Sequence, residues 1–93
     1  MAEQQPLALT PTPKDLVAEL SLAENTRYTV QFFVFGDDVL HMMEGSTSPD
    51  RGSTRGFQYE NREQAIVEPK GDPIWAWAPG STGRGLVEVV EAP

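Results

Sequence analysis

The fold of this chain is decided by one stretch, Arg27-Tyr28-Thr29-Val30-Gln31-Phe32-Phe33-Val34-Phe35. It is dense in aromatic and β-branched residues, which favour extended strands. Successive side chains of a strand point to opposite faces, so its inner face is expected to consist of Tyr28, Val30, Phe32 and Val34. Phe33 and Phe35 then fall on the other face. Such large residues there imply burial on both sides of the strand, within the chain or against another subunit, or a bulge that changes the alternation.

Further strand patterns follow along the sequence. Gly36-Asp37-Asp38 predicts a tight turn, after which residues 39–44 return as a strand that pairs antiparallel with the first. Later strands are expected at 57–59, 64–68, 73–78 and 85–91. From 16 to 22 the leucines alternate with polar or smaller residues, which favours a strand over a short helix capped by Asp15.

About seven short strands, separated by glycine and proline, predict an all-β fold. We expect a small antiparallel β-sandwich or jelly-roll-like barrel formed by a single domain over residues 15–93. Residues 1–14 contain three prolines among polar residues and predict a flexible arm. Leu7 and Leu9 are the apolar exceptions in this arm, and they suggest a segment that docks on a neighbour.

Composition excludes several classes of partner and site. The chain has 93 residues, with seven basic against fourteen acidic side chains and a net charge of -7, which argues against nucleic acid as a ligand. It has no cysteine, which excludes disulfides and thiolate zinc sites, and a single histidine, which excludes most histidine-based metal clusters. No apolar run approaches the length of a membrane helix, and residues 1–6 have neither the basic start nor the apolar run of a signal peptide, so we expect no membrane partner and synthesis in the cytoplasm.

No pattern of catalytic or cofactor-binding residues emerges. His41 has no predicted acid or nucleophile beside it, so a structural role is expected rather than general-base catalysis. The Asp37-Asp38 pair lacks the spacing of a calcium loop, and the glycine-rich run 79–85 lacks the lysine and helix of a phosphate loop. We therefore expect neither an enzyme nor a bound metal or cofactor.

Two regions are candidate contact surfaces. The loop 45–56 is long and entirely polar, and Arg51 and Arg55 within it suit carboxylates on a partner, although a solvated loop is an equal alternative. Trp75 and Trp77 lie two positions apart, so they share one face of a strand. Their indoles could serve the core, a protein interface or a platform on which sugar rings stack.

The order of motifs from Leu16 to Val89 resembles that of small β-sandwich structural proteins found in the virions of tailed bacteriophages and prophages. The residues that carry this resemblance are Tyr28-Thr29-Val30-Gln31 and Ile74-Trp75-Ala76-Trp77. Where such proteins usually place small turn residues after the glutamine, this chain has Phe32-Phe33-Val34-Phe35, which indicates an additional buried or subunit-facing side.

The resemblance implies a virion protein without an active site, such as a capsid decoration, spike-base or tail-associated protein. As a virion protein it would attach to major capsid or tail proteins. The leucines of the arm and the surplus aromatic surface also favour symmetric self-association, with a trimer or another ring as the expected state. The expected interface residues, taken together, are Leu7, Leu9, Phe33, Phe35, Arg51, Arg55, Trp75 and Trp77. The alternative function is a carbohydrate-binding module that uses Trp75 and Trp77.

Overall fold

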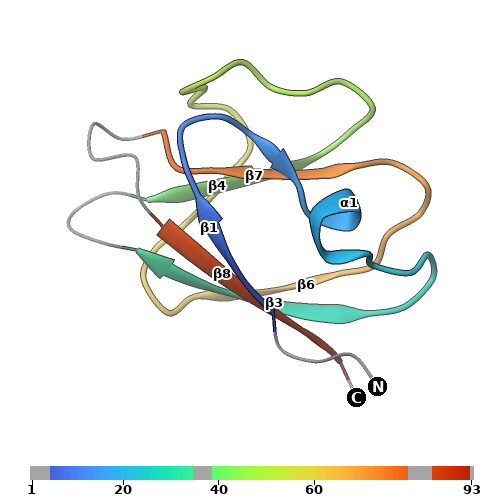
Figure 1. Ribbon diagram of the computed structural model, residues 1–93. Helices are drawn as coiled ribbons and strands as arrows, with labels where there is room; N and C mark the ends of the chain where they lie inside the picture. The colour runs from blue at the N-terminus through green and yellow to red at the C-terminus, as the bar shows by residue number, and fades with distance from the viewer. Residues whose placement is uncertain (1–4, 35–38, 80–84, 93) are drawn as a thin grey trace.

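Two antiparallel sheets face each other in the computed structural model, which describes residues 5–34, 39–79 and 85–92 (Figure 1). Within those residues each sheet has four strands. Sheet A has the order β1 (Gln5–Leu9), β8 (Gly85–Glu91), β3 (Tyr28–Val34), β6 (Gln64–Val67). Sheet B has the order β2 (Lys14–Asp15), β7 (Ile74–Trp77), β4 (Leu40–Glu44), β5 (Phe57–Tyr59). The predicted small antiparallel β-sandwich is confirmed.

Strand β3 is the centre of sheet A and shows the predicted alternation. Its buried side chains are Tyr28, Val30, Phe32 and Val34, and the residues between them are half-buried. It pairs along its whole length with β8 and over its first four residues with β6. The phase of one strand therefore fixes which face of sheet A turns toward sheet B.

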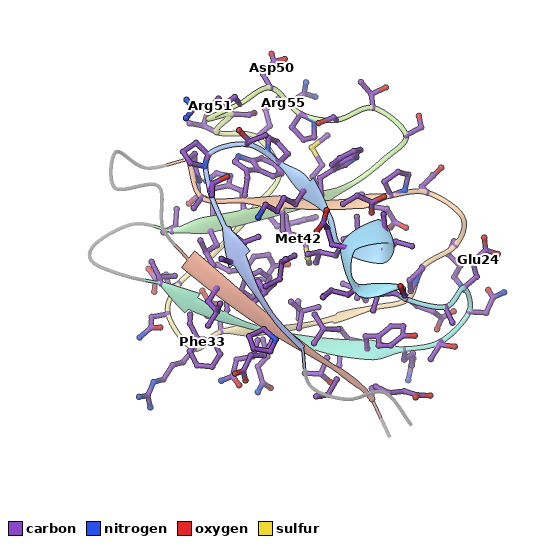
Figure 2. All side chains as sticks on the ribbon, viewed as in Figure 1. Glu24, Phe33, Met42, Asp50, Arg51 and Arg55 are labelled. Atoms are coloured by element: carbon purple, nitrogen blue, oxygen red, sulfur yellow. The ribbon has the colours of Figure 1, made fainter. Side chains whose placement is uncertain are left out.

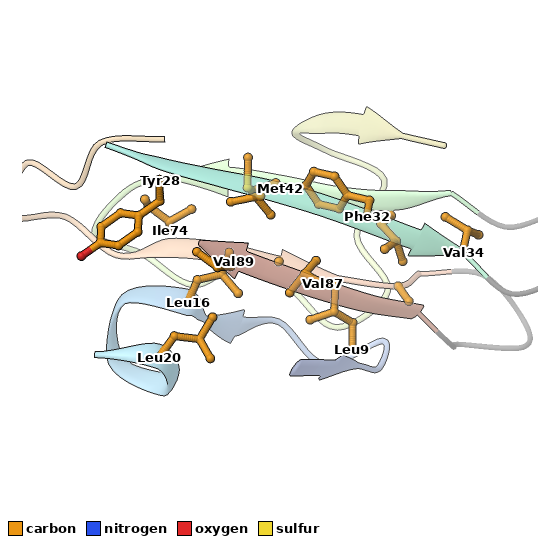
Figure 3. Packing of buried hydrophobic residues seen from close by; sticks show 14 residues of the cluster. Leu9, Leu16, Leu20, Tyr28, Phe32, Val34, Met42, Ile74, Val87 and Val89 are labelled. Carbon is orange, nitrogen blue, oxygen red and sulfur yellow. The ribbon is translucent and has the colours of Figure 1, made fainter. Parts of the chain in front are cut away.

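The core lies between the two sheets and is lined from both (Figure 3). Phe32 of sheet A stacks on Tyr59 of sheet B, with ring centroids 4.1 Å apart and planes 7° from parallel. Tyr28 and Ile74 lie at the end of the cluster near the helix, and Val34 lies at the opposite end (Figure 3). The register of each strand thus contributes every second residue to a common apolar layer.

The segment after Asp15 forms a helix, α1 (Leu16–Leu20), so the predicted strand over 16–22 is wrong. Asp15 caps the helix, because its Oδ1 accepts the N–H of Val17 at 2.9 Å. Leu16 and Leu20 are four residues apart and share one helical face, which is buried at one end of the sandwich (Figure 1). Leucines at even spacing satisfy the periods of both a strand and a short helix, and the cap decides between them.

The predicted pairing of the strands on either side of residues 36–38 is also wrong. β3 and β4 belong to different sheets, and the chain crosses from one sheet to the other between them. The reason is that both edges of β3 are already paired, with β8 and β6, while β4 pairs with β7 and β5. The expected turn at 36–38 lies outside the described residues.

Residues 5–15 form two edge strands where the sequence predicts an arm. β1 pairs with β8 at the edge of sheet A, and β2 pairs with β7 at the edge of sheet B. Between them, the carbonyl oxygens of Thr10 and Pro11 accept the N–H groups of Ala78 at 2.8 Å and Gly52 at 2.9 Å. Proline is tolerated in β1 because an edge strand needs its amide donors on one side only.

Candidate functional site

The outer face of sheet B carries His41, Trp75 and Trp77, three residues whose roles the sequence leaves to be decided. The register of β4 and β7 sets His41 opposite Trp77 and Met43 opposite Trp75. Their neighbours Met42 and Ala76 belong to the core between the sheets, so these four side chains point the other way. The two tryptophans share one face, as predicted.

The loop 45–56 covers this face and is held there by three side chains. Trp75 Nε1 donates to the carbonyl oxygen of Gly45 at 2.9 Å, and Trp77 Nε1 donates to that of Ser53 at 2.7 Å. His41 Nδ1 lies 2.7 Å from the carbonyl oxygen of Arg55, a distance that places its ring proton on Nδ1. The polar loop therefore supplies backbone acceptors to buried aromatic donors.

This arrangement makes Trp77 and His41 structural residues. Trp77 is 0% exposed, His41 is 2% exposed, and their rings lie 5.5 Å apart. Among the described residues, every buried side-chain nitrogen or oxygen has a hydrogen-bond partner. Trp75 is half-buried and is tied to Gly45, so the pair does not form an open platform for a sugar ring.

Arg51 and Arg55 lie on the exposed side of the same loop, together with Asp50 (Figure 2). Of these two arginines, Arg55 contributes its carbonyl oxygen to His41, and within the described part of the chain neither guanidinium is within ion-pair distance of a carboxylate. A hollow of about 390 Å³ lies beside Arg55, lined by Met43, Thr47, Ser48, Pro49, Asp50, Ser53 and Arg55. Within the described residues, the loop thus presents two guanidinium groups at its surface that have no ion-pair partner.

The outer face of sheet A lies on the opposite side of the molecule, where Phe33 points away from the interior (Figure 2). The register aligns Phe33 with Leu86 and Ala8 in one row, and Thr29 with Val90 and Ile66 in another. Between these rows lie Gln64, Gln31, Glu88 and Pro6. The predicted companion of Phe33, Phe35, lies outside the described residues.

Leu7 and Leu9 do not belong to this outer face. Leu9 is 2% exposed and is part of the core, and Leu7 packs against that core. The register sets Leu7 opposite Val87, which also points inward. The two leucines of the expected arm therefore pack within their own chain in this structure.

A groove at the β5–β6 side of the sandwich was not predicted from the sequence. It has a volume of about 230 Å³ and is lined by Met42, Met43, Glu44, Phe57, Tyr59, Ile66, Val67, Glu68 and Ile74. Phe57 and Ile66 at its walls are 74% and 61% exposed. The sequence feature that could have indicated this groove is the shortness of the strand that carries Phe57 and Tyr59, because very short strands are typical of sheet edges.

Two groups of this groove have shifted pKa values. Partial burial, followed by the charge of Glu63, raises the pKa of Tyr59 above its ordinary value. The hydrogen bond and charge of Lys70, with a smaller contribution from Arg27, lower the pKa of Glu68. At neutral pH the groove therefore combines the un-ionised phenol of Tyr59 with the ionised carboxylate of Glu68.

No group of three or more metal-ligating side chains occurs among the residues that the structure describes. In that same part of the chain, none of the helices combines the length and the apolar character needed to cross a bilayer. A scan against protein-family models finds no match to this chain, and searches of the curated proteins and of the solved structures find none either.

Proposed function

We propose that this chain is a non-enzymatic structural protein that associates with itself through the outer face of sheet A. The observation that carries the proposal is the set of large apolar side chains on that face: Phe33, Ile66, Leu86 and Val90. Phe33, Leu86 and Val90 are only half-buried within the chain, and Ile66 is 61% exposed. Burying a fully exposed side chain of this kind contributes about 1.5–3 kcal/mol, and association would add the part of that gain that corresponds to the fraction still exposed.

A second copy is the occupant that this face suits best. The chain carries a net charge of -7, so two copies repel each other unless they meet where charge is sparse. Along the four strands of sheet A, the outward positions carry one ionisable side chain, Glu88, among apolar, threonine, glutamine and proline residues. Association through this face brings apolar surfaces together and keeps most of the acidic groups in solvent.

The proposal extends to a location in the virion of a tailed bacteriophage, after synthesis in the host cytoplasm. Its support is the motif pattern in Tyr28–Gln31 and Ile74–Trp77, which resembles that of small virion β-sandwich proteins. In this role the chain is a capsid decoration or a head or tail accessory protein, and its partners are copies of itself and major capsid or tail proteins. A trimer or another closed ring is the proposed state, since identical subunits with closed symmetry form an assembly of fixed size.

The cover over Trp77 disfavours the alternative function, carbohydrate binding by Trp75 and Trp77. A sugar platform needs exposed indole faces, but Trp77 is fully covered by the loop 45–56. The same cover separates His41 from solvent. Neither Trp77 nor His41 is therefore included in the proposed function.

Site-directed cross-linking tests the interface, because the chain has no cysteine and a single introduced thiol is unique. Thr29→Cys places the thiol on the outer face of sheet A, and Glu19→Cys places it on the exposed side of α1. With a short bifunctional maleimide, Thr29→Cys is expected to give covalent dimers and Glu19→Cys to remain monomeric. Equal cross-linking of both variants, or cross-linking of neither, would overturn the proposed interface.

A further inference from the structure

The groove between β5 and β6 is a second surface, which adjoins the outer face of sheet A at Ile66. β5 is the last strand of sheet B and β6 is the last strand of sheet A, so the groove opens where both sheets end. Its floor is apolar and includes Met42 and Ile74 of the core. Phe57, at 74% exposure, stands at its wall with most of its ring uncovered. An apolar side chain entering this groove would meet aromatic and thioether surfaces.

The backbone beside the groove is arranged to receive another strand. Phe32 N–H donates to the carbonyl oxygen of Glu63 at 2.9 Å, and Arg62 N–H donates to that of Phe32 at 2.7 Å. Hydrogen-bonded pairs alternate along an antiparallel ladder, so the backbone groups of Gln64 and Ile66 point away from β3. Among the described residues β6 has no other neighbouring strand, and this edge is open.

The charge around the groove selects the kind of partner. Among the described residues, its charged lining residues are Glu44 and Glu68, and none of the described lysines or arginines lines it. Lys70 and Arg27 pair with Glu68, whereas Glu44 is exposed and, within the described part of the chain, no cation lies within ion-pair distance of it. A second copy of this chain, with its own net charge of -7, is disfavoured here.

We propose that this groove binds an extended, basic segment of a different protein by strand addition to β6. One apolar side chain of that segment occupies the groove against Phe57, and a lysine or arginine of the segment pairs with Glu44. Main-chain hydrogen bonds to Gln64 and Ile66 supply affinity, and the groove supplies selectivity. The inference goes beyond self-association and does not depend on it. The two surfaces share Ile66, but Phe57 and Glu44 line the groove alone and Phe33 lies on the outer face alone.

Fluorescence anisotropy with synthetic peptides tests this proposal. The probe is a labelled peptide of about eight residues, the length of one strand, that alternates valine and phenylalanine with lysine. The comparison peptides replace every lysine with glutamate, or replace two central residues with proline at unchanged charge. We expect saturable binding of the lysine peptide and at least a tenfold weaker affinity for each comparison peptide, because the first loses the charge match and the second loses the amide donors.

Matched variants locate the binding site. Phe57→Ala is expected to weaken binding of the lysine peptide about tenfold, whereas Phe33→Ala on the outer face of sheet A leaves it unchanged. Glu44→Gln is expected to weaken binding several-fold, whereas Glu19→Gln on α1 does not. Phe57 and Glu44 are exposed, so the far-ultraviolet circular dichroism of these variants should match that of the unsubstituted protein.

Several outcomes would overturn the proposal. Equal binding of the lysine and proline peptides means that charge alone drives association, without strand addition. Equal effects of Phe57→Ala and Phe33→Ala place the peptide elsewhere. Absence of saturable binding by the lysine peptide removes the basic segment as the occupant, and it leaves the cross-linking result for sheet A unaffected.

Discussion

The indole nitrogen of Trp77 donates a hydrogen bond of 2.7 Å to the carbonyl oxygen of Ser53, a residue 24 positions earlier in the chain. This bond ties the centre of the loop 45–56 to the outer face of sheet B. The carbonyl oxygens of Gly45 and Arg55 in the same loop form hydrogen bonds with the side chains of Trp75 and His41. A segment without apolar residues is thus ordered by donors that the strands provide.

Removing the Trp77 donor should loosen the loop. Trp77→Phe keeps an aromatic ring but leaves the carbonyl of Ser53 without its partner and leaves a space beside His41. We expect a loss of about 1–3 kcal/mol in the free energy of unfolding, measured by urea denaturation. Trp75→Phe is the matched control, and its loss should be smaller because Trp75 is half-buried. Equal losses in the two variants would contradict the assignment.

The helix cap should depend on one side chain. Asp15 Oδ1 accepts the N–H of Val17 at 2.9 Å and that of Ile74 at 3.3 Å, so it joins α1 to β7. Asp15→Ala should lower the free energy of unfolding by about 1–2 kcal/mol, the upper part of the range for a lost N-cap. Asp15→Asn retains an acceptor oxygen and should recover most of that loss. Thermal and urea denaturation of the two variants would measure the difference.

Close packing at Gly85 should make any larger residue at this position destabilising. A Cβ atom built at this residue lies 2.3 Å from Cδ2 of Leu40, which is itself fully buried. Gly85→Ala is therefore expected to cost about 1–3 kcal/mol through overpacking. Gly45→Ala is the control, because a Cβ there meets nothing within 4 Å. A Gly85→Ala protein as stable as the Gly45→Ala protein would contradict this close approach.

Stability should fall at alkaline pH because of Tyr59. Burial and Glu63 raise its pKa above the ordinary value of 10.0, so the folded state holds the phenolic proton more tightly than the unfolded state. The stability from this difference is fully present below pH 10 and is lost as the pH rises through the folded pKa. Urea denaturation from pH 8 to 11 should show a shallower decline for Tyr59→Phe, which keeps the ring stacked on Phe32. Parallel declines would show that Tyr59 does not cause the loss.

Much of the fold could be predicted from periodicity alone. The two-residue alternation of β3 gave its inner face correctly, and the later strands lie where β-branched and aromatic residues gather. The pairing of the strands could not be predicted, because the alternation of a strand shows which of its faces is buried but not which strands lie beside it. For that reason β3 and β4 were expected to form a hairpin, whereas each belongs to a different sheet.

Short elements and long-range contacts were harder to infer. The five residues of α1 are too few for their apolar pattern to distinguish a helix from a strand. Only the N-cap at Asp15 indicates a helix. Phe33 was expected on a second face and lies there, but the cover over Trp77 comes from a loop whose composition gave no sign of it. Phe57 and Ile66 were missed, because exposure at a sheet edge depends on the order of strands.

The most direct test of the central proposal is the mass of the untagged protein in solution, measured by size-exclusion chromatography with light scattering. The variants Phe33→Glu and Phe57→Glu are measured in the same way for comparison. We predict a multiple of 10.2 kDa for the unsubstituted protein and for Phe57→Glu, and 10.2 kDa for Phe33→Glu, because a carboxylate at position 33 cannot be buried between copies. A single-chain mass for the unsubstituted protein, or an assembly that survives Phe33→Glu, would contradict association through the outer face of sheet A.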